Sequence, residues 1–579
     1  MSTSSATQAG SRRVWLDPAP VAPGAPRLDP DPLVNQLLQG VVADAEAAAA
    51  FLRTDPQPSP DPFLLPGMAD AVDRIGRAMA EGERIVVFGD YDADGVTSTA
   101  ILLLSIEAAG GTRPEWVLPT RPEGYGLSVA AAERIAQGGP GLLVLVDCGS
   151  RDHAAVGRAQ ALGMEVVIFD HHQRVDAGPP GAIVVSARVR DGAPYRELAA
   201  AGIAYLFATA LTRNGHDLGR GAGREPLHLL DLVAIGLVGD ASEMTGAARA
   251  MVRSGMAWLS RINRPGVVAL CAQAKVDPRA VRSHDVAMRL APRVNAPGRM
   301  AEPDLALELL LAEDERQARH LAEQVEKRNI GRQQETSALV ADVQARLAAD
   351  GGTDRRLLLV IGEGWHHGVV GLVAGKIAQQ YDRPTVLLSV DGDEVVGSAR
   401  SVKGFDVTAA LESCADLLVR FGGHSQAAGL RLARANVDRL AAALEAEVVS
   451  AGLGLPQPEA IRIRAELPFE RMTTQTAEVL HRLEPFGSAF PEPILRLSGV
   501  RVRFADRIGQ GQNHLKLKFD GPHGPAEAVL WGQGDRVESA RQAGVVDLVG
   551  RLTVNEWQNR RTPQIVAEDF RPTAARAGR

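Results

Sequence analysis

Three carboxylates fall within five residues of this sequence, at Asp90, Asp92 and Asp94. They directly follow the apolar run Ile85–Phe88, and the apolar segment 96–104 behind them has the pattern of a helix. Carboxylates this close repel one another, by ~1 kcal/mol per pair at 4 Å in water and ~4 kcal/mol at an effective dielectric constant of 20. Such a cluster therefore either stays in solvent or binds a cation.

Two other interpretations of the cluster come first. The spacing D-x-D-x-D-G also opens a calcium-binding EF-hand loop, but that loop needs a bidentate Glu at its twelfth position and a helix in front. The twelfth position here is Ile101, and the segment before Asp90 is strand-like, so the EF-hand is excluded. A polar strand-to-helix turn in which Asp94 caps the helix stays open on these six residues alone.

Further aspartates follow other expected strands. From residue 63 onward strands alternate with helices, which predicts an α/β fold with a parallel sheet. The expected strands are 84–89, 142–146, 165–169 and 232–238. An aspartate follows each of them directly or after one residue, at Asp90, Asp147, Asp170 and Asp240. Ligands of open α/β sheets bind beyond the carboxyl ends of the strands, so we expect these four carboxylates on one rim.

Two histidines add nitrogen ligands to this rim, because His171 and His172 directly follow Asp170. Mixed imidazole and carboxylate ligands suit Mn²⁺, with Mg²⁺ or Fe²⁺ as alternatives. With only three cysteines, far apart in the sequence, a closed thiolate zinc site is excluded, and we expect Cys148 to be a packing residue. The acidic ligands exceed the needs of one ion, and two ions ~3.5–4 Å apart can catalyse phosphoester hydrolysis. The sequence predicts a two-metal phosphoesterase.

Length and composition indicate which class of protein carries this site. The chain has 579 residues, enough for three or four domains, and a net charge of −7 that does not by itself indicate a nucleic-acid binder. Nearly all basic residues are Arg, which binds phosphate in a forked geometry better than Lys does. We find no apolar core of a signal peptide in residues 1–10 and no run long enough to span a membrane, so we expect a soluble, cytoplasmic protein.

The pattern divides the chain into five parts. A Pro- and Ala-rich N-terminal segment should be mobile apart from a helix over 32–52, and a charged helical segment of one or two helices should join two α/β domains. The last part, with about half a dozen short strands in ~110 residues, suits an OB-fold barrel. The expected boundaries are 1–60 (N-terminal segment), 61–302 (first α/β domain), 303–350 (connecting helix), 351–455 (second α/β domain) and 456–579 (barrel and C-terminal tail).

These motifs resemble a known superfamily. The segments 90–95, 147–150 and 170–172 with Asp240 resemble the four motifs of the DHH phosphoesterases, and 422–424 resembles their DHHA1 domain. The segments 123–128, 291–300, 364–371 and 483–487 are similar to the RecJ family, over roughly residues 60–570. The resemblance implies DHH, DHHA1 and OB domains in that order. It also implies a 5′→3′ exonuclease specific for single-stranded DNA that releases 5′-mononucleotides in DNA repair and recombination. The implied partners are a single-strand-binding protein and a helicase, with the chain as a monomer.

The resemblance also implies roles for single residues. The metal ligands would be Asp90, Asp92, Asp147, His171 and Asp240, with Asp147 bridging two ions. Asp94 and His172 would support these ligands or stabilise the transition state, and His172 could also face the scissile phosphate. The implied substrate-binding residues are Arg121, Tyr125, Arg293, Asn295, Arg299, Ser398, Arg400, Gly422, Gly423 and His424. Each Arg could instead be a solvated or ion-paired surface residue, and Tyr125 could stack on a base or fill the core.

Two alternatives to the exonuclease remain. One is a nano-RNase or nucleotide phosphatase of the same superfamily, and the other is a catalytically silent, replication-associated scaffold that binds single-stranded DNA. The silent relatives lose metal ligands, whereas all five remain here. The sequence departs from the family pattern at Phe88, at 186–187 and at 241–244, but none of these departures removes an expected ligand. In the barrel, basic and aromatic residues suit single-strand binding, although solvated strand faces would look the same: Arg501, Arg503, Lys516, Lys518, Trp531, Arg551, Trp557, Arg560 and Arg561.

Overall fold

The computed structural model divides the chain into two compact units. The residues it describes are 13–53, 59–121, 123–172, 178–189, 191–218, 224–261, 264–349, 355–453, 460–509, 511–557 and 560–573. The larger unit runs from residue 59 to residue 453, and the barrel unit combines residues 13–53 with residues 460–573. Residues 1–12, on which the signal-peptide prediction falls, and residues 454–459, which contain the expected boundary between the second α/β domain and the barrel, lie outside this description.

The larger unit begins with a five-stranded parallel sheet in the order β3-β2-β4-β5-β6. Its inner strands are β2 (Ile85–Phe88), β4 (Gly141–Val146) and β5 (Met164–Phe169), and β3 (Glu115–Val117) and β6 (Ile183–Val185) form the edges. The inner strands are almost continuously apolar and buried, as expected for a parallel sheet covered on both faces. The predicted α/β class is therefore confirmed.

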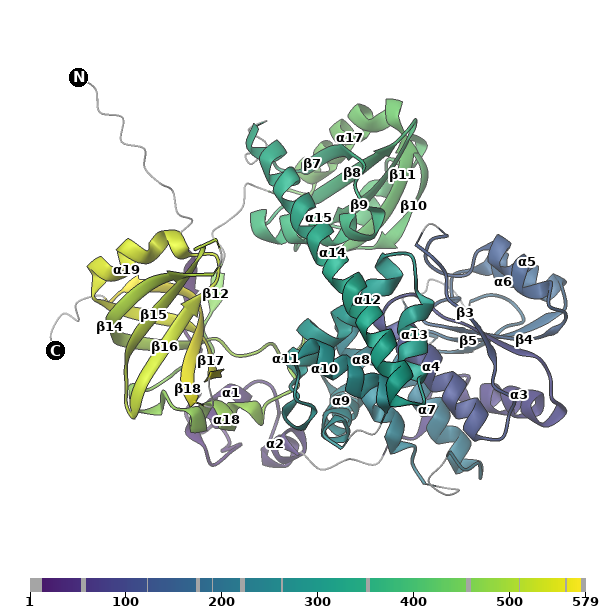
Figure 1. Cartoon of the computed structure of the whole chain (residues 1–579), viewed down its shortest axis with the longest axis horizontal. Coiled ribbons are helices and arrows are strands. Elements are labelled where there is room, and N and C mark those ends of the chain that lie inside the picture. The colour runs from purple at the N-terminus through teal and green to yellow at the C-terminus, as the bar shows by residue number, and fades with distance from the viewer. Residues whose placement is uncertain are drawn as a thin grey trace. The chain divides into compact units, whose positions relative to one another are not determined.

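Helices cover both faces of this sheet (Figure 1). Val86 and Phe88 of β2 point into a core with α5 (Val129–Ala136) and α6 (His153–Ala161). Ile85 and Val87 point into the opposite core, with the helices α3 (Met68–Glu81), α4 (Ala93–Ala108) and α7 (Ala200–Arg213). Successive side chains alternate between the two cores, so the ends of the strands stay free to carry polar groups.

One predicted strand is wrong. Residues 232–238 lie in helix α8 (Leu230–Gly239), which packs against α4, α7 and α9 (Gly246–Leu259). The helix is buried on all sides, because Leu232, Val233 and Ile235 are each fully covered. A short apolar run does not distinguish a buried strand from a buried helix by its period. Asp240 consequently follows a helix end rather than a strand end.

The connecting segment contains one long helix. Helix α13 (Asp304–Leu311) precedes α14 (Glu315–Ala349), which is continuous, so most of the predicted connecting segment is a single helix. Helix α14 packs against α10 (Pro265–Ala274) and α12 (Ala291–Arg299) and then against α15 (His367–Tyr381). It therefore links the helices behind the first sheet to the second α/β part of the unit.

The second α/β part has a five-stranded sheet in the order β10-β11-β9-β8-β7. Strands β7 (Leu358–Glu363) and β8 (Thr385–Asp391) are parallel, and the other pairs are antiparallel. The remaining strands are β9 (Glu394–Arg400), β10 (Leu418–His424) and β11 (Ala427–Ala433), with α16 (Val407–Glu412) and α17 (Val437–Ser450) among the helices. No described helix of the chain is both long and apolar enough to cross a membrane.

The barrel unit contains a closed sheet. Its strands follow the order β13-β14-β15-β16-β18-β17, and β14 also pairs with β17, so five strands form a ring. A closed five-stranded barrel has the architecture predicted for this part of the chain. The strands are β13 (Ala465–Glu466), β14 (Leu495–Ile508), β15 (His514–Gly521), β16 (Gly524–Leu530), β17 (Val545–Trp557) and β18 (Arg560–Pro572), with α18 (Thr474–His481) and α19 (Val537–Ala543) between them.

The N-terminal segment differs from the prediction of a mobile stretch with one helix. Strand β1 (Val14–Leu16) pairs with β12 (Ala460–Arg462), and two helices follow, α1 (Pro32–Leu38) and α2 (Ala45–Leu52). Leu33, Val34 and Leu37 are buried in the same core as the barrel. Asp31 accepts two hydrogen bonds from Arg471. Contacts with residues more than 400 positions away order this segment, and no local pattern reveals them.

Candidate metal centre

The aspartate motif forms the turn between β2 and α4. The Asp92 carboxylate caps α4, because Oδ1 accepts hydrogen bonds from the backbone N–H of Asp94 (2.9 Å) and Gly95 (3.0 Å). Gly95 is required here, since a Cβ atom would lie 2.5 Å from the carbonyl oxygen of Asp90. The motif is thus both a capped turn and a group of buried carboxylates, and the cap is Asp92 rather than Asp94.

Asp94 is buried and binds the start of another helix. Its Oδ2 accepts a hydrogen bond from the N–H of Ala200 (2.7 Å), and its Oδ1 accepts one from the N–H of Ala201 (2.9 Å). Both donors belong to the first turn of α7, where the helix dipole favours a negative charge. These bonds fix the position of the Asp94 carboxylate between α4 and α7.

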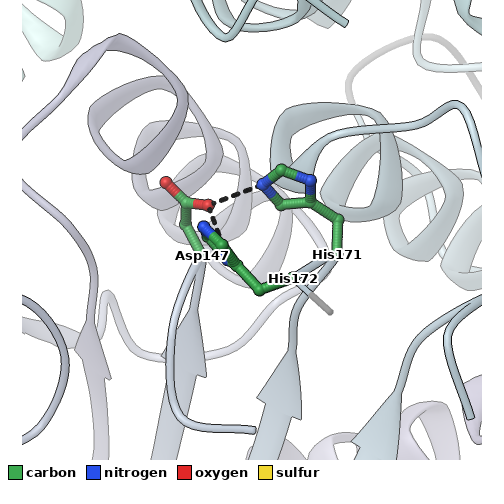
Figure 2. A group of neighbouring side chains, drawn as sticks. All are labelled: Asp147, His171 and His172. Carbon is green, nitrogen blue, oxygen red and sulfur yellow. Dashed lines mark ion pairs between the residues drawn. The ribbon is translucent and has the colours of Figure 1, made fainter. Parts of the chain in front are cut away.

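Asp147 follows β4 in a left-handed conformation, with φ = 64°. This conformation costs a residue other than glycine on the order of 1–3 kcal/mol, and such residues cluster at functional sites. Two contacts hold it: its N–H donates to the carbonyl of Phe169 (2.9 Å), and its carbonyl accepts from the Tyr125 hydroxyl (2.8 Å). Its carboxylate Oδ1 lies 3.2 Å from His171 Nε2 and 3.9 Å from His172 Nδ1 (Figure 2).

Asp170 orients the second histidine. Its Oδ1 accepts the N–H of His172 (3.1 Å) and lies 2.8 Å from His172 Nδ1, and its Oδ2 accepts the N–H of Ser150 (3.2 Å). Burial raises the pKa of Asp170, but the hydrogen bond and charge of His172, the charge of His171 and the hydrogen bond with Ser150 together outweigh burial, and the net pKa lies below the ordinary value. Burial lowers the pKa of His172, yet the hydrogen bond with Asp170 and the charges of Asp170, Asp240 and Asp92 together outweigh burial and raise this pKa to about 8. The sequence prediction placed Asp170 on the rim but gave it no role; the structure makes it the partner of His172.

The predicted ligands come together in overlapping groups. Asp90 and Asp92 form one group with Asp147, and Asp94 and Asp240 form another with His171; within each group the ligand atoms lie within 4.8 Å of one another. Asp147, His171 and His172 form a third group of the same kind, which connects the other two. The arrangement has the form of two adjacent cation sites with Asp147 between them.

The chemistry of these atoms fits divalent cations. Asp90 Oδ1, Asp147 Oδ1 and His171 Nε2 are buried and have no hydrogen-bond partner among the described residues. Burial and the charge of Asp92 raise the pKa of Asp90 to about 8, and burial and Asp240 raise that of Asp94 to about 7. Burial and Asp94 raise the pKa of Asp147 well above its ordinary value. A bound cation would offset this repulsion, and oxygen ligands with one or two imidazoles suit Mn²⁺ or Mg²⁺.

Several predicted substrate residues form a cationic group. Burial and the charge of Arg121 lower the pKa of Arg299 to about 9, and the same two causes lower the pKa of Arg400. The Arg400 Nη1 donates to the Ser398 hydroxyl (2.7 Å), and the Arg121 guanidinium lies 4.5 Å from the centre of the Tyr91 ring. Two arginines whose pKa is lowered by burial and by the charge of a third offer favourable binding to an anion such as a phosphate.

Two other predicted substrate residues make scaffold contacts instead. Arg293 forms an ion pair with Glu326 (Nε to Oε2, 2.6 Å) and donates to the carbonyl of Arg289. Asn295 accepts the N–H of Ala93 (2.7 Å) through its amide oxygen, which fixes the turn of the aspartate motif. Both side chains thus make structural contacts, and their predicted contact with substrate stays a prediction.

The remaining predicted residues lie near His172. The ring of His424, from β10, stacks on the ring of His172 with centroids 5.6 Å apart and planes 12° apart. Gly422 and Gly423 precede His424 in the same strand. Tyr125 is 45% exposed, so it is not a core residue, and its hydroxyl lies 2.9 Å from His172 Nδ1.

Other residues singled out in the sequence are buried. Trp365, in the segment 364–371, is buried and donates to the Asp342 carboxylate (2.9 Å). Cys148 is buried in a core, as predicted. Phe88, Ser186 and Met244, at the positions that depart from the family pattern, are buried too. Ala241 and Glu243, by contrast, are exposed, and the Ser242 hydroxyl donates to Asp240 Oδ2 (3.2 Å). None of the departing residues belongs to the groups of candidate ligands.

The basic residues of the barrel are largely paired with acids. Lys516 contacts Glu527 (2.6 Å), Arg503 contacts Asp520 and Arg561 contacts Glu478 (2.8 Å). Arg551 likewise contacts Glu568. The side chain of Trp557 lies outside the described residues. A basic strand face is therefore a weaker signal here than the sequence suggested.

Comparison with known proteins places each part of the chain. Residues 84–237 match the N-terminal domain of the DHH family, residues 354–450 the DHHA1 domain and residues 463–569 the RecJ OB domain. The single-stranded-DNA-specific exonuclease RecJ of Dickeya dadantii is 34% identical over 540 residues, which cover 88% of this chain and 91% of that protein.

Solved structures agree with this relationship. The crystal structure of RecJ from Thermus thermophilus with Mn²⁺ matches with a TM-score of 0.78 at 28% identity, covering 97% of this chain and 80% of that one. The Mg²⁺ complex of RecJ from the same organism matches with a TM-score of 0.71 at 27% identity, covering 97% and 79%. With its three domain matches and its ligand groups in the same chain, this protein belongs to the RecJ family of the DHH superfamily.

Proposed function

We propose that this protein is a metal-dependent exonuclease that degrades single-stranded DNA in the 5′→3′ direction and releases 5′-mononucleotides in DNA repair and recombination. The observation that carries the proposal is the pair of ligand groups joined at Asp147. A group of neighbouring arginines in the same unit supports it, and so does the similarity to single-stranded-DNA-specific exonucleases.

We assign Asp90, Asp92 and Asp147 to one ion, and Asp94, His171 and Asp240 to a second ion beside Asp147. This assignment adds Asp94 to the ligands predicted from the sequence. Mn²⁺ is the expected metal and Mg²⁺ the alternative, since both occur in the structures of the Thermus relative. When bound, divalent ions make a water molecule more acidic and neutralise charge on the reacting phosphate.

The residues of the chain then orient the substrate. Asp170 holds His172 with Nδ1 toward the carboxylate, so the raised pKa keeps the imidazole cationic near pH 7 and suited to a phosphate oxygen. Release of a 5′-mononucleotide breaks the P–O3′ bond and leaves a new 5′-phosphate on the shortened strand. The protein can bind this product end in the same way as the original end, so degradation continues in one direction.

We assign the terminal 5′-phosphate to a group of four residues. The charge of Arg121 lowers the pKa of Arg299 and of Arg400, which indicates that the three arginines are neighbours. Arg400 also donates to the Ser398 hydroxyl (2.7 Å). The exposed ring of Tyr125 is assigned to stacking on a base. Gly422, Gly423 and His424 are assigned to the phosphate next to the scissile one.

The broader predictions from the sequence also stand as proposals. We propose the domain boundaries 61–302, 303–350, 351–455 and 456–579, with residues 13–53 added to the barrel. A single-strand-binding protein and a helicase are the proposed partners, the chain is proposed to act as a monomer, and the cytoplasm is its proposed location.

The test is digestion of a 5′-phosphorylated 30-mer carrying a label at either the 5′ or the 3′ end, with Mn²⁺ or Mg²⁺. The proposal predicts immediate release of labelled mononucleotide from the 5′-labelled strand and late release from the 3′-labelled strand. Release from the 3′ end first would contradict the direction. Faster turnover of a dinucleotide than of the 30-mer would favour a nano-RNase, and tight binding without hydrolysis would favour a silent scaffold.

A further inference from the structure

Gly371, in helix α15, lies against the side chains of two predicted substrate residues. The helix packs along β8 and β9 of the second sheet (Figure 1). A Cβ atom at Gly371 would lie 2.8 Å from Arg400 Nη2 and 3.1 Å from the Ser398 hydroxyl oxygen. Nonbonded heavy atoms attract one another most at about 3.5–4.0 Å, so alanine does not fit here unless a neighbour shifts.

The Arg400 guanidinium is held at one nitrogen and free at another. Its Nη1 donates to the Ser398 hydroxyl (2.7 Å) and to the carbonyl of Ala399 (2.9 Å). No described residue accepts a hydrogen bond from its Nη2, which is the nitrogen that lies nearest to Gly371. The N–H groups of Nη2 therefore remain for an anionic ligand, and the space at Gly371 determines where they lie.

Helix α15 is held in place on its other sides. Val373 is fully buried in a core with α14 and the second sheet. At the start of the helix, Gly368 lies so close to Arg299 that a Cβ atom would overlap the carbonyl oxygen of that residue. A side chain at Gly371 would therefore displace the end of the Arg400 side chain rather than the helix.

Gly375, one turn further along the same helix, offers a comparison. Both glycines are half-buried. A Cβ atom at Gly375 would lie 3.9 Å from Arg400 Nε, which is an ordinary contact. Alanine thus fits at Gly375 without moving Arg400. At Gly371 it fits only when the free end of the guanidinium moves, and because that end belongs to a flexible side chain, the fold loses little.

We propose that Gly371 is a positioning residue for the recognition of a 5′-phosphate, because it leaves the Arg400 guanidinium its place beside α15. This inference rests on the proposed function for the assignment of the terminal phosphate to Arg400. Gly371 acts through Arg400 and Ser398 and not by a contact of its own. Glycine inside a helix lowers its stability relative to alanine. Alanine at this position should therefore preserve or raise stability while it lowers the selectivity for a phosphorylated end.

The test measures Kd by anisotropy for two thymidylate 30-mers with a 3′-fluorescein, one with a 5′-phosphate and one with a 5′-hydroxyl. The full chain is kept in EDTA so that no cleavage occurs, and the preference is the ratio of the two Kd values. Gly371→Ala should lower the preference about tenfold, the value of a charge-assisted hydrogen bond. Its melting temperature should be no lower than that of the wild type. The matched control Gly375→Ala should keep the preference within about twofold.

A double variant shows whether Gly371 acts through Arg400. Substitutions that remove the same interaction are not additive, so Gly371→Ala should change the preference of the Arg400→Gln variant by less than about twofold. A further loss as large as that in the wild-type background would overturn the inference, because Gly371 would then act independently of Arg400.

The remaining outcomes separate this inference from the proposed function. An unchanged preference in Gly371→Ala, with or without a lower melting temperature, would mean that the glycine serves packing alone, and the exonuclease would stand. An equal loss in Gly375→Ala would also overturn the positioning role. A wild type without any preference would refute the terminal-phosphate assignment and the inference with it. Mn²⁺ added to the wild type tests the exonuclease itself: a preference that depends on Gly371 without release of mononucleotides would refute only the exonuclease.

Discussion

The rim of the first sheet and the surface of the barrel use charge in opposite ways. At the rim, Asp90, Asp94 and Asp147 are buried side by side, and burial with mutual repulsion raises their pKa values. On the barrel, Arg503 and Asp520 lie in solvent and neutralise each other. Buried like charges are costly and persist where a ligand compensates them, whereas exposed opposite charges contribute little. The comparison therefore locates function at the rim more reliably than any count of charged residues does.

The largest effect is expected from Asp147→Asn. The substitution keeps the shape of the side chain and removes the carboxylate that both ligand groups approach. We expect release of mononucleotides to fall by about 10³-fold or more, as for other catalytic groups that act as a unit. Initial rates on a 5′-phosphorylated 30-mer measure this loss. A rate within tenfold of the wild type would show that the rim is not the reaction centre.

Substitutions of Arg400, in the cationic group, and of Arg293, which pairs with Glu326, should have different effects. Arg400→Gln removes a charge assigned to the terminal phosphate, so the preference for a 5′-phosphate over a 5′-hydroxyl should fall about 10- to 100-fold, the value of a charge-assisted hydrogen bond. Arg293→Gln breaks the ion pair with Glu326 and should lower the melting temperature without changing this preference. Competition between the two substrates measures it, and an equal change in both variants would contradict the assignment.

The metal-free protein should lose stability as the pH rises. A carboxyl group whose pKa is higher in the folded than in the unfolded state stabilises the fold below the unfolded value, and this stability is lost as the pH rises through the folded value. The folded values are about 8 for Asp90 and about 7 for Asp94, so the loss should extend from about pH 4 to about pH 8. Urea unfolding in EDTA at four pH values measures it. Added Mn²⁺ should restore stability at pH 8, and metal-free stability that rises over this window would be inconsistent with the carboxylate cluster.

The smallest effect is expected on the barrel. Arg503→Gln breaks an exposed ion pair whose side chains are 60% and 66% exposed. Such pairs contribute about 0–1 kcal/mol, so the free energy of unfolding and the Kd for single-stranded DNA should both stay close to those of the wild type. A tenfold weaker affinity for single-stranded DNA would mean that Arg503 contacts DNA. The exposed ion pairs of the barrel would then take part in function as the buried carboxylates of the rim do.

The sequence predicted the rim because Asp90, Asp147 and Asp170 follow parallel strands, whose ends meet at one edge by the geometry of the sheet. Asp240 was placed correctly although it follows a helix, because α8 ends at the same place as the expected strand. Pairs that depend on distant segments could not be predicted. Glu326 neutralises Arg293 from another helix, and the start of α7 binds Asp94 from more than 100 residues away.

Two cations are proposed to share the rim beside Asp147, and equilibrium dialysis with Mn²⁺ counts them. The number of ions bound per chain at saturation is measured for the wild type, for Asp147→Asn and for Arg293→Gln as the scaffold control. We expect two bound Mn²⁺ ions per chain for the wild type and for Arg293→Gln, and at most one for Asp147→Asn. A single ion in the wild type, or two ions retained with unchanged affinity by Asp147→Asn, would contradict it.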